Sequence, residues 1–69
     1  MEETFFERLV TERNELSTRT DKLHEFVNNP KIGATFYALD ATDQALLQNQ
    51  LVYMQEYLAI LNQRIGILS

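Results

Sequence analysis

The chain has 69 residues, no cysteine, one histidine and a formal net charge of −4. A chain this short buries a small share of its surface, so it needs disulfides, a metal or association with another chain to become stable. The absence of cysteine excludes disulfides and thiolate zinc sites, and the negative charge argues against nonspecific binding to DNA or RNA. We therefore expect a homo-oligomer without a structural metal that binds no nucleic-acid polymer.

The hydrophobic share of 45% is typical of a chain that folds. Met1 is followed by two glutamates, which is unlike the basic segment that opens a secretory signal. No uninterrupted apolar run approaches the ~20 residues that a helix needs to span a bilayer. These features predict a cytoplasmic protein that contacts no membrane.

The first expected helix covers residues from about 2 to 28, a stretch without Gly or Pro. Its core positions recur in alternating steps of three and four, which is a heptad seam. Arg13 and Thr20 interrupt the seam, and polar interruptions of this kind usually fix register or oligomeric state. The complete seam is Phe6, Leu9, Arg13, Leu16, Thr20, Leu23 and Val27.

An Asn-Asn-Pro sequence at residues 28–30 ends this helix, because Asn favours caps and Pro restricts the residue before it. A connection follows from about residue 29 to 39, which is longer than a turn between two helices needs. It carries Lys31 and the aromatic pair Phe36 and Tyr37. Because loops often carry function, this segment is a candidate site.

The second expected helix runs from about residue 40 to 67, with Asp40 or Thr42 as its N-cap. It carries two apolar stripes, and one partner helix cannot cover both. We therefore predict an all-α, single-domain chain over residues 1–69, a two-helix antiparallel hairpin that assembles into an oligomeric helical bundle. The first seam is Leu47, Leu51, Met54, Leu58, Leu61, Ile65 and Leu68; the second stripe is Leu46, Tyr53, Tyr57, Ile60 and Ile67.

Candidate catalytic groups are few. His24 has no Ser, Cys or second His placed to work with it, and a catalytic histidine needs an oriented partner. The spacing of Glu12 with Glu15, and of Asp40 with Asp43, is typical of a solvated helix face and a helix cap. We therefore expect that the protein is not an enzyme.

Cationic side chains offer anion contacts. Arg13 and Arg64 fall within apolar stripes, where a guanidinium needs a carboxylate, an anionic ligand or a place at the edge of an interface. Arg8 has Glu12 at helical distance, so ordinary ion pairing is the simpler interpretation, with ligand contact as the alternative. Lys31 on the connection is a further candidate for a phosphate contact.

Aromatic and amide side chains offer contacts to a base. Phe36 and Tyr37 on the connection can stack on one, whereas packing is the favoured interpretation of Tyr53 and Tyr57. Glutamines on the second helix can bond base edges, namely Gln44, Gln48 and Gln50. The predicted ligand-binding residues are Arg8, Arg13, Lys31, Phe36, Tyr37, Gln48, Tyr53 and Arg64.

These patterns also resemble known proteins. The pattern Glu7-Arg8-Leu9, Glu15-Leu16, Lys22-Leu23, Phe26-Val27, Leu46-Leu47, Gln50, Met54, Tyr57-Leu58, Leu61 and Arg64-Ile65 resembles small phage helical-hairpin proteins first catalogued in crAss-like phages. The segment from Asn29-Pro30 through Tyr37 and Leu39 into the second helix is similar to the helical hairpin of phage anti-CBASS and anti-Thoeris sponge proteins. Those families bind cyclic nucleotide or related immune signals at subunit interfaces.

The resemblance implies a phage immune-evasion sponge that sequesters a cyclic oligonucleotide second messenger at an oligomer interface, in the cytoplasm of an infected bacterial cell, without a cofactor. Two other hypotheses stay open. The second stripe can bind a helix of a host or phage protein. The negative charge is also consistent with inhibition of a nucleic-acid enzyme by an acidic helical surface.

Overall fold

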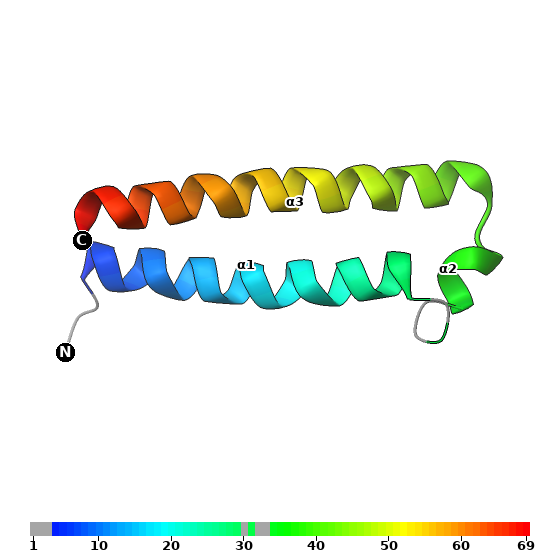
Figure 1. The fold of residues 1–69 in the computed structure, drawn as a ribbon, viewed down its shortest axis with the longest axis horizontal. Coiled ribbons are helices and arrows are strands. Elements are labelled where there is room, and N and C mark those ends of the chain that lie inside the picture. Colours follow the sequence, from blue (N-terminus) through cyan, green and yellow to red (C-terminus); the bar gives the residue numbers. More distant parts are fainter. Residues whose placement is uncertain (1–3, 30, 32–33) are drawn as a thin grey trace.

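The computed structural model describes residues 4–29, 31 and 34–69. These residues form α1 (Phe5–Asn28), α2 (Ala34–Ala38) and α3 (Ala41–Leu68), with no strand in the described part of the chain. The all-helical fold class is thereby confirmed. α1 and α3 lie side by side and α2 lies at one end, where the chain crosses between them (Figure 1). The molecule measures 46 × 21 × 16 Å.

Side-chain caps determine where the long helices begin. Thr4 is extended, its hydroxyl accepts a hydrogen bond from the Glu7 N–H at 3.0 Å, and its own N–H donates to the Glu7 carboxylate at 3.3 Å. This capping box starts α1 at Phe5 instead of at about residue 2; residues 2 and 3 lie outside the described residues. Asp40 caps α3 by accepting from the Asp43 N–H at 2.8 Å.

The connection contains a helix that the sequence pattern did not predict. α2 is held against both neighbours, because the Tyr37 hydroxyl donates to the Val27 carbonyl of α1 at 3.2 Å and the Gln44 amide of α3 donates to the Tyr37 carbonyl at 3.4 Å. Phe36 is 1% exposed and meets the Phe26 ring edge-on, with the ring centroids 5.8 Å apart. α2 therefore packs across one end of the helix pair, where Phe36 is buried together with Val27 and Leu51.

The core consists of two clusters joined along the α1–α3 contact. One contains Leu9, Leu16 and Leu61, and the other contains Val27, Phe36 and Leu51, each with partly buried neighbours. Thr20 is buried in α1, and its hydroxyl donates to the Leu16 carbonyl at 2.7 Å, which satisfies it within the helix. The seam of α1 and the first seam of α3 thus supply most of the core.

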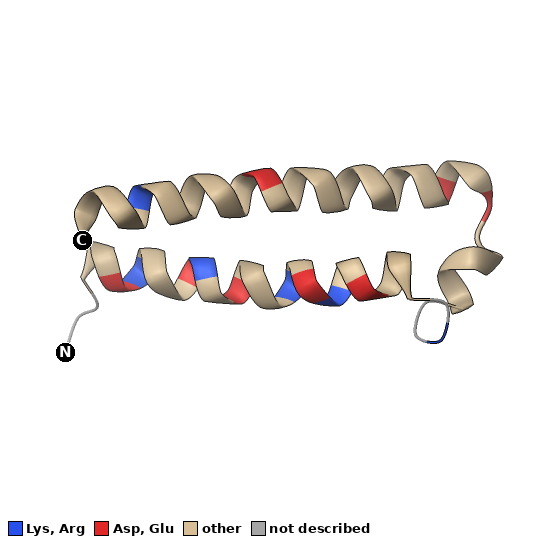
Figure 2. Ribbon diagram, viewed as in Figure 1, with Lys and Arg blue, Asp and Glu red and all other residues tan. Residues whose placement is uncertain are grey.

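The two long helices differ in their outer surfaces. Nine of the 24 residues of α1 are charged, whereas only Asp43, Glu56 and Arg64 are charged among the 28 residues of α3 (Figure 2). All five members of the second stripe are exposed, Tyr53 by 69% and Ile67 by 82%. Within the described ranges, no helix has the length and apolar character needed to cross a membrane.

Candidate ligand-binding face

A groove lies on the second stripe of α3. It is shallow and largely open to solvent, with a volume of about 640 Å³. The side chains around it follow one another on a single helix in alternating steps of three and one, so the regular periodicity of α3 is enough to bring them together. We call it the Tyr53 groove; it is lined by Leu46, Asn49, Gln50, Tyr53, Met54 and Tyr57.

The groove combines flat, apolar and amide surfaces. Tyr53 exposes its ring, and Met54, which also packs on the core, supplies a polarizable apolar floor. Asn49 and Gln50 are exposed amides, and the Gln50 amide lies 3.8 Å from the Met54 sulfur. An amide both donates and accepts hydrogen bonds, so this surface suits a planar ring with polar edges.

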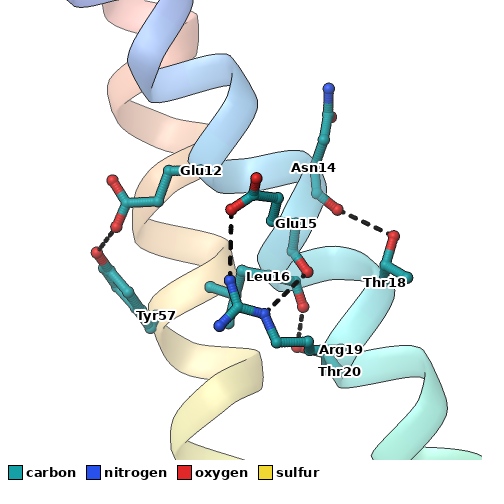
Figure 3. A network of polar contacts seen from close by, with 8 residues as sticks. All are labelled: Glu12, Asn14, Glu15, Leu16, Thr18, Arg19, Thr20 and Tyr57. Carbon is teal, nitrogen blue, oxygen red and sulfur yellow. Dashed lines mark hydrogen bonds and ion pairs between the residues drawn. The ribbon is translucent and has the colours of Figure 1, made fainter.

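Tyr57 links the groove to α1. Its hydroxyl donates a hydrogen bond to the Glu12 carboxylate, across the junction of the two long helices (Figure 3). This bond raises the pKa of Tyr57 above its ordinary value of 10.0, partial burial and the negative charge of Glu12 act in the same direction, and the positive charge of Arg64 opposes them. The Tyr57 ring is thereby oriented at the edge of the groove.

Charged side chains of α1 line the same flank as Glu12. Arg8, Glu12, Glu15 and Arg19 follow in steps of four, three and four, which places them on one face of α1. Arg19 pairs with Glu15 at 3.5 Å, with both side chains largely exposed (Figure 3). The described part of the chain shows no Arg8–Glu12 ion pair, because Glu12 instead accepts from Tyr57.

The two arginines within apolar stripes have different surroundings. Arg13 is partly buried and donates to the side-chain oxygens of Asn62 at 2.8 Å and Asn14 at 2.9 Å, so it joins α1 to α3. Arg64 is exposed, and its guanidinium lies 5.9 Å from the centre of the Phe5 ring. Arg13 therefore has a structural partner, whereas only a weak exposed contact holds Arg64.

The remaining predicted ligand residues lie apart from the groove. Lys31 and Gln48 are exposed, and the Lys31 N–H donates to the Asn29 side chain at 3.0 Å. Phe36 belongs to the core, which corrects the expectation that its ring is free to stack on a base. Tyr37 is half exposed, but its hydroxyl is engaged with α1. The aromatic connection is thus mainly a packing element.

The sequence interpretation omitted three groove residues as ligand contacts, namely Leu46, which is predicted only as part of the second stripe, and Asn49 and Met54. Asn49 lies four residues before Tyr53, and Met54 lies three before Tyr57, so both are helical neighbours of residues already considered as stacking surfaces. A search for polar or polarizable neighbours of each tyrosine would have found them. The favoured interpretation of Tyr53 as a packing residue does not hold within the single chain, because its side chain is largely exposed.

The fold and groove define a small, all-helical protein with a surface suited to a flat ligand. The family model for Sequestin matches residues 3–67, and the chain belongs to this family. A comparison with curated proteins and a comparison with solved structures found no match. The family name indicates sequestration, which fits the class of protein expected from the resemblance to sponge proteins.

Proposed function

We propose that this protein is a phage immune-evasion sponge that sequesters a cyclic oligonucleotide second messenger, without catalysis, at an interface between subunits. The observation that carries the proposal is membership of the Sequestin family over nearly the whole chain. A sequestering protein lowers the free concentration of its ligand by binding alone, so it needs a complementary surface and no reactive group.

The Tyr53 groove supplies such a surface. The rings of Tyr53 and Tyr57 offer flat faces to a base, and Asn49 and Gln50 offer donors and acceptors to its edges. Arg8 and Arg64 are exposed cations available to phosphates, whereas Arg19 pairs with Glu15. An anionic ligand with planar rings matches this combination better than a purely apolar or purely ionic one does.

The proposal also states that the two long helices form an antiparallel hairpin, that several copies of the chain form an oligomer, and that the protein acts in the cytoplasm. The second stripe is left uncovered by α1, so a further chain has an apolar surface to contact. A second messenger of a bacterial defence system acts in the cytoplasm, so the sponge acts there, in the infected cell. The similarity to proteins of crAss-like phages remains a prediction about its origin.

Isothermal titration with cyclic di-AMP, cyclic di-GMP and cyclic GMP–AMP tests the ligand class. We expect saturable binding of at least one of them, and a loss of at least about fivefold in affinity for Tyr53→Ala, because base–aromatic stacking contributes roughly 1–3 kcal/mol. Val52→Ala is the matched control, since Val52 is exposed on α3 and does not line the groove. Absence of heat and of a thermal shift for all three nucleotides would overturn the ligand class.

Recovery of the bound nucleotide tests the absence of catalysis. After prolonged incubation and heat denaturation of the protein, we expect the intact mass of the nucleotide at the input quantity. A hydrolysed or linearised product that accumulates with time would replace sequestration by an enzymatic function.

The second stripe also supports a different function, the capture of a host or phage protein helix in a groove. In that case, substitution of Tyr53 and Ile60 would abolish capture of the partner, and no cyclic nucleotide would compete with it. Competition by a bound nucleotide would favour the sponge.

A further inference from the structure

We infer that the second stripe of α3 is covered by a second copy of this chain, with its α3 antiparallel, and that Arg64 of each copy completes the Tyr53 groove of the other. The ligand part of this inference rests on the proposed function, whereas the pairing of the two chains does not. The inference starts from the charge distribution of the helix pair.

The outer surface of α3 is unlike that of a helix that faces water. Between Asp43 and Arg64 the helix carries a single charged residue, Glu56, over 20 positions, whereas α1 carries charges throughout its length (Figure 2). Charged residues are depleted at the centre of protein interfaces, and contiguous apolar patches on monomers rarely exceed a few hundred Å². The low charge of α3 therefore indicates a face that a protein surface covers.

The area of the second stripe suits a small dimer. Its five side chains are exposed by 44% to 82%, so at roughly 200 Å² for a large side chain they offer on the order of 600 Å² per copy. The polar side chains beside them add to this area. A standard interface buries about 800 Å² per partner, so the stripe supplies most of what a stable dimer requires.

The spacing of the stripe is self-complementary when two copies run antiparallel. Leu46, Tyr53, Ile60 and Ile67 are seven residues apart, so reversal about a point midway between Tyr53 and Ile60 places each of these four opposite another of them, whereas Tyr57, the fifth member of the stripe, falls opposite Glu56. Leu46 then faces Ile67 of the second copy, and Tyr53 faces its Ile60. A two-fold axis satisfies both copies with the same surface, as a closed dimer requires.

Charge favours the antiparallel orientation through Arg64 alone, because both orientations place the two Glu56 side chains close together. A parallel pair in register would place the two Arg64 side chains together on the stripe. In the antiparallel pair they lie about 15 residues apart along the helix axis, or roughly 22 Å at 1.5 Å per residue. Each Arg64 then lies near the N-terminal end of α3 of the second copy. Asp40 and Asp43 lie at that end, and their negative charges compensate the positive pole of the helix dipole.

This arrangement brings a cation to a groove that has none in its own lining. Arg64 of the second copy lies opposite Asn49, between the amide side chains and Leu46 of the first. Its described side-chain interactions are the 5.9 Å approach to Phe5 and an electrostatic interaction with Tyr57 of its own chain; because Arg64 is exposed, its guanidinium can be redirected at small cost. A base at the open edge of the interface, against the part of the Tyr53 ring that Ile60 of the second copy leaves uncovered, would then have its phosphate beside the arginine of the other chain.

Sedimentation equilibrium without ligand tests the pairing. We expect a dimer, or a multiple of it, at micromolar concentration for the wild-type chain. Ile60→Glu should raise the dissociation constant of the dimer by at least about a hundredfold, because it places two buried charges in the interface. Val52→Glu is the control, because Val52 is exposed on α3 outside the second stripe. A wild-type monomer at these concentrations would overturn the inference and leave the stripe to another protein.

Cross-linking tests the orientation, and the absence of native cysteine makes it specific. A mixture of Leu46→Cys and Ile67→Cys chains should form a disulfide between the two different variants, because these positions face each other in the antiparallel pair. Each variant alone should remain uncross-linked. Efficient cross-linking of either variant with itself would establish a parallel pair and overturn the antiparallel one, and this readout does not depend on Ile60→Glu folding.

Complementation tests the contribution of Arg64. Tyr53→Ala and Arg64→Ala should each lose nucleotide binding, yet an equal mixture should regain about one quarter of the wild-type sites, because a mixed two-fold dimer has one intact pair of Tyr53 and Arg64. No recovery in mixtures that exchange subunits would overturn the shared site. A dimer that binds no nucleotide would instead reject the proposed function and leave the pairing intact.

Discussion

α1 and α3 are of similar length and lie side by side, yet they differ in how much charge they carry on their outer surfaces. α1 buries one stripe and exposes charged residues elsewhere, as a helix with one partner does. α3 buries its first seam against α1 and exposes the second stripe, with almost no charge around it. This difference is what the proposed pairing of two chains predicts, because a helix that packs on two sides has less surface for charged residues.

The contrast predicts a large effect on the first seam of α3. Leu61 is 0% exposed and packs against Leu9 and Leu16. Leu61→Ala should lower the free energy of unfolding by about 2–5 kcal/mol, because the truncation leaves a cavity in the core. Urea denaturation followed by circular dichroism, at one fixed protein concentration, measures this change.

Val52→Ala provides the reference for that measurement, since Val52 lies on α3 away from both stripes. We expect a change within about 0.5 kcal/mol. Equal destabilisation by the two substitutions would contradict the assignment of the first seam to the core.

The capping box of α1 should have the next largest effect. Thr4→Ala removes the hydroxyl that accepts from Glu7, so the free energy of unfolding should fall by about 1 kcal/mol, within the usual range of roughly 0.5–2 kcal/mol. Thr18→Ala is the comparison, because the Thr18 hydroxyl only donates to the Asn14 carbonyl within the exposed face of the helix. Thermal unfolding of both variants should separate them, and a larger loss for Thr18→Ala would argue against the cap.

Near its C-terminal end, α3 offers a stabilising change of smaller size. A Cβ atom at Gly66 meets nothing within 4 Å. Gly66→Ala should therefore raise the free energy of unfolding by about 0.5–1 kcal/mol, because alanine loses less backbone entropy in a helix. The reverse change at an exposed position of the same helix, Ala59→Gly, should lower it by a similar amount. Destabilisation by Gly66→Ala would show that this turn contacts another chain.

The hydrogen bond between Tyr57 of α3 and Glu12 of α1 predicts that the stability of the folded chain depends on pH. Because the folded-state pKa of Tyr57 is raised, the stabilisation from this bond is complete below the unfolded value of 10.0 and is lost as the pH rises through the folded value. Glu12→Gln should lower the pKa of Tyr57 toward 10.0, measured by phenolate absorbance. Glu15→Gln should leave the pKa of Tyr57 unchanged, because Glu15 pairs with Arg19. An equal shift of the Tyr57 pKa in both variants would contradict a specific hydrogen bond between Tyr57 and Glu12.

The sequence predicted periodic features better than local ones. Leu9, Leu16 and Leu61 are buried where the alternating steps of three and four placed them, because this periodicity follows directly from helix geometry. α2 was missed because five residues are too few for a periodic signal, and Phe36 is consequently in the core instead of on a loop. Helices this short depend on tertiary contacts, which a single segment does not encode.

The candidate site was predicted in part for a related reason. Tyr53 was identified from its ring, but its exposure depends on which stripe of α3 faces α1, and periodicity alone leaves that choice open. The sequence marks Arg13 as unusual within an apolar seam. Its partner Asn62 lies 49 positions away in the sequence, so the contact between them depends on the register of α1 against α3. Such pairings require the relative rotation of both helices.

The position of the chain ends has a consequence for protein engineering. α1 begins and α3 ends at the same end of the molecule, and α2 occupies the other (Figure 1). In a two-fold antiparallel dimer, a peptide that joins the end of one copy to the start of the other must therefore follow the long dimension of 46 Å. A glycine–serine tether has a root-mean-square span of about 5–6 Å times the square root of its length, so roughly 60–80 residues match this distance.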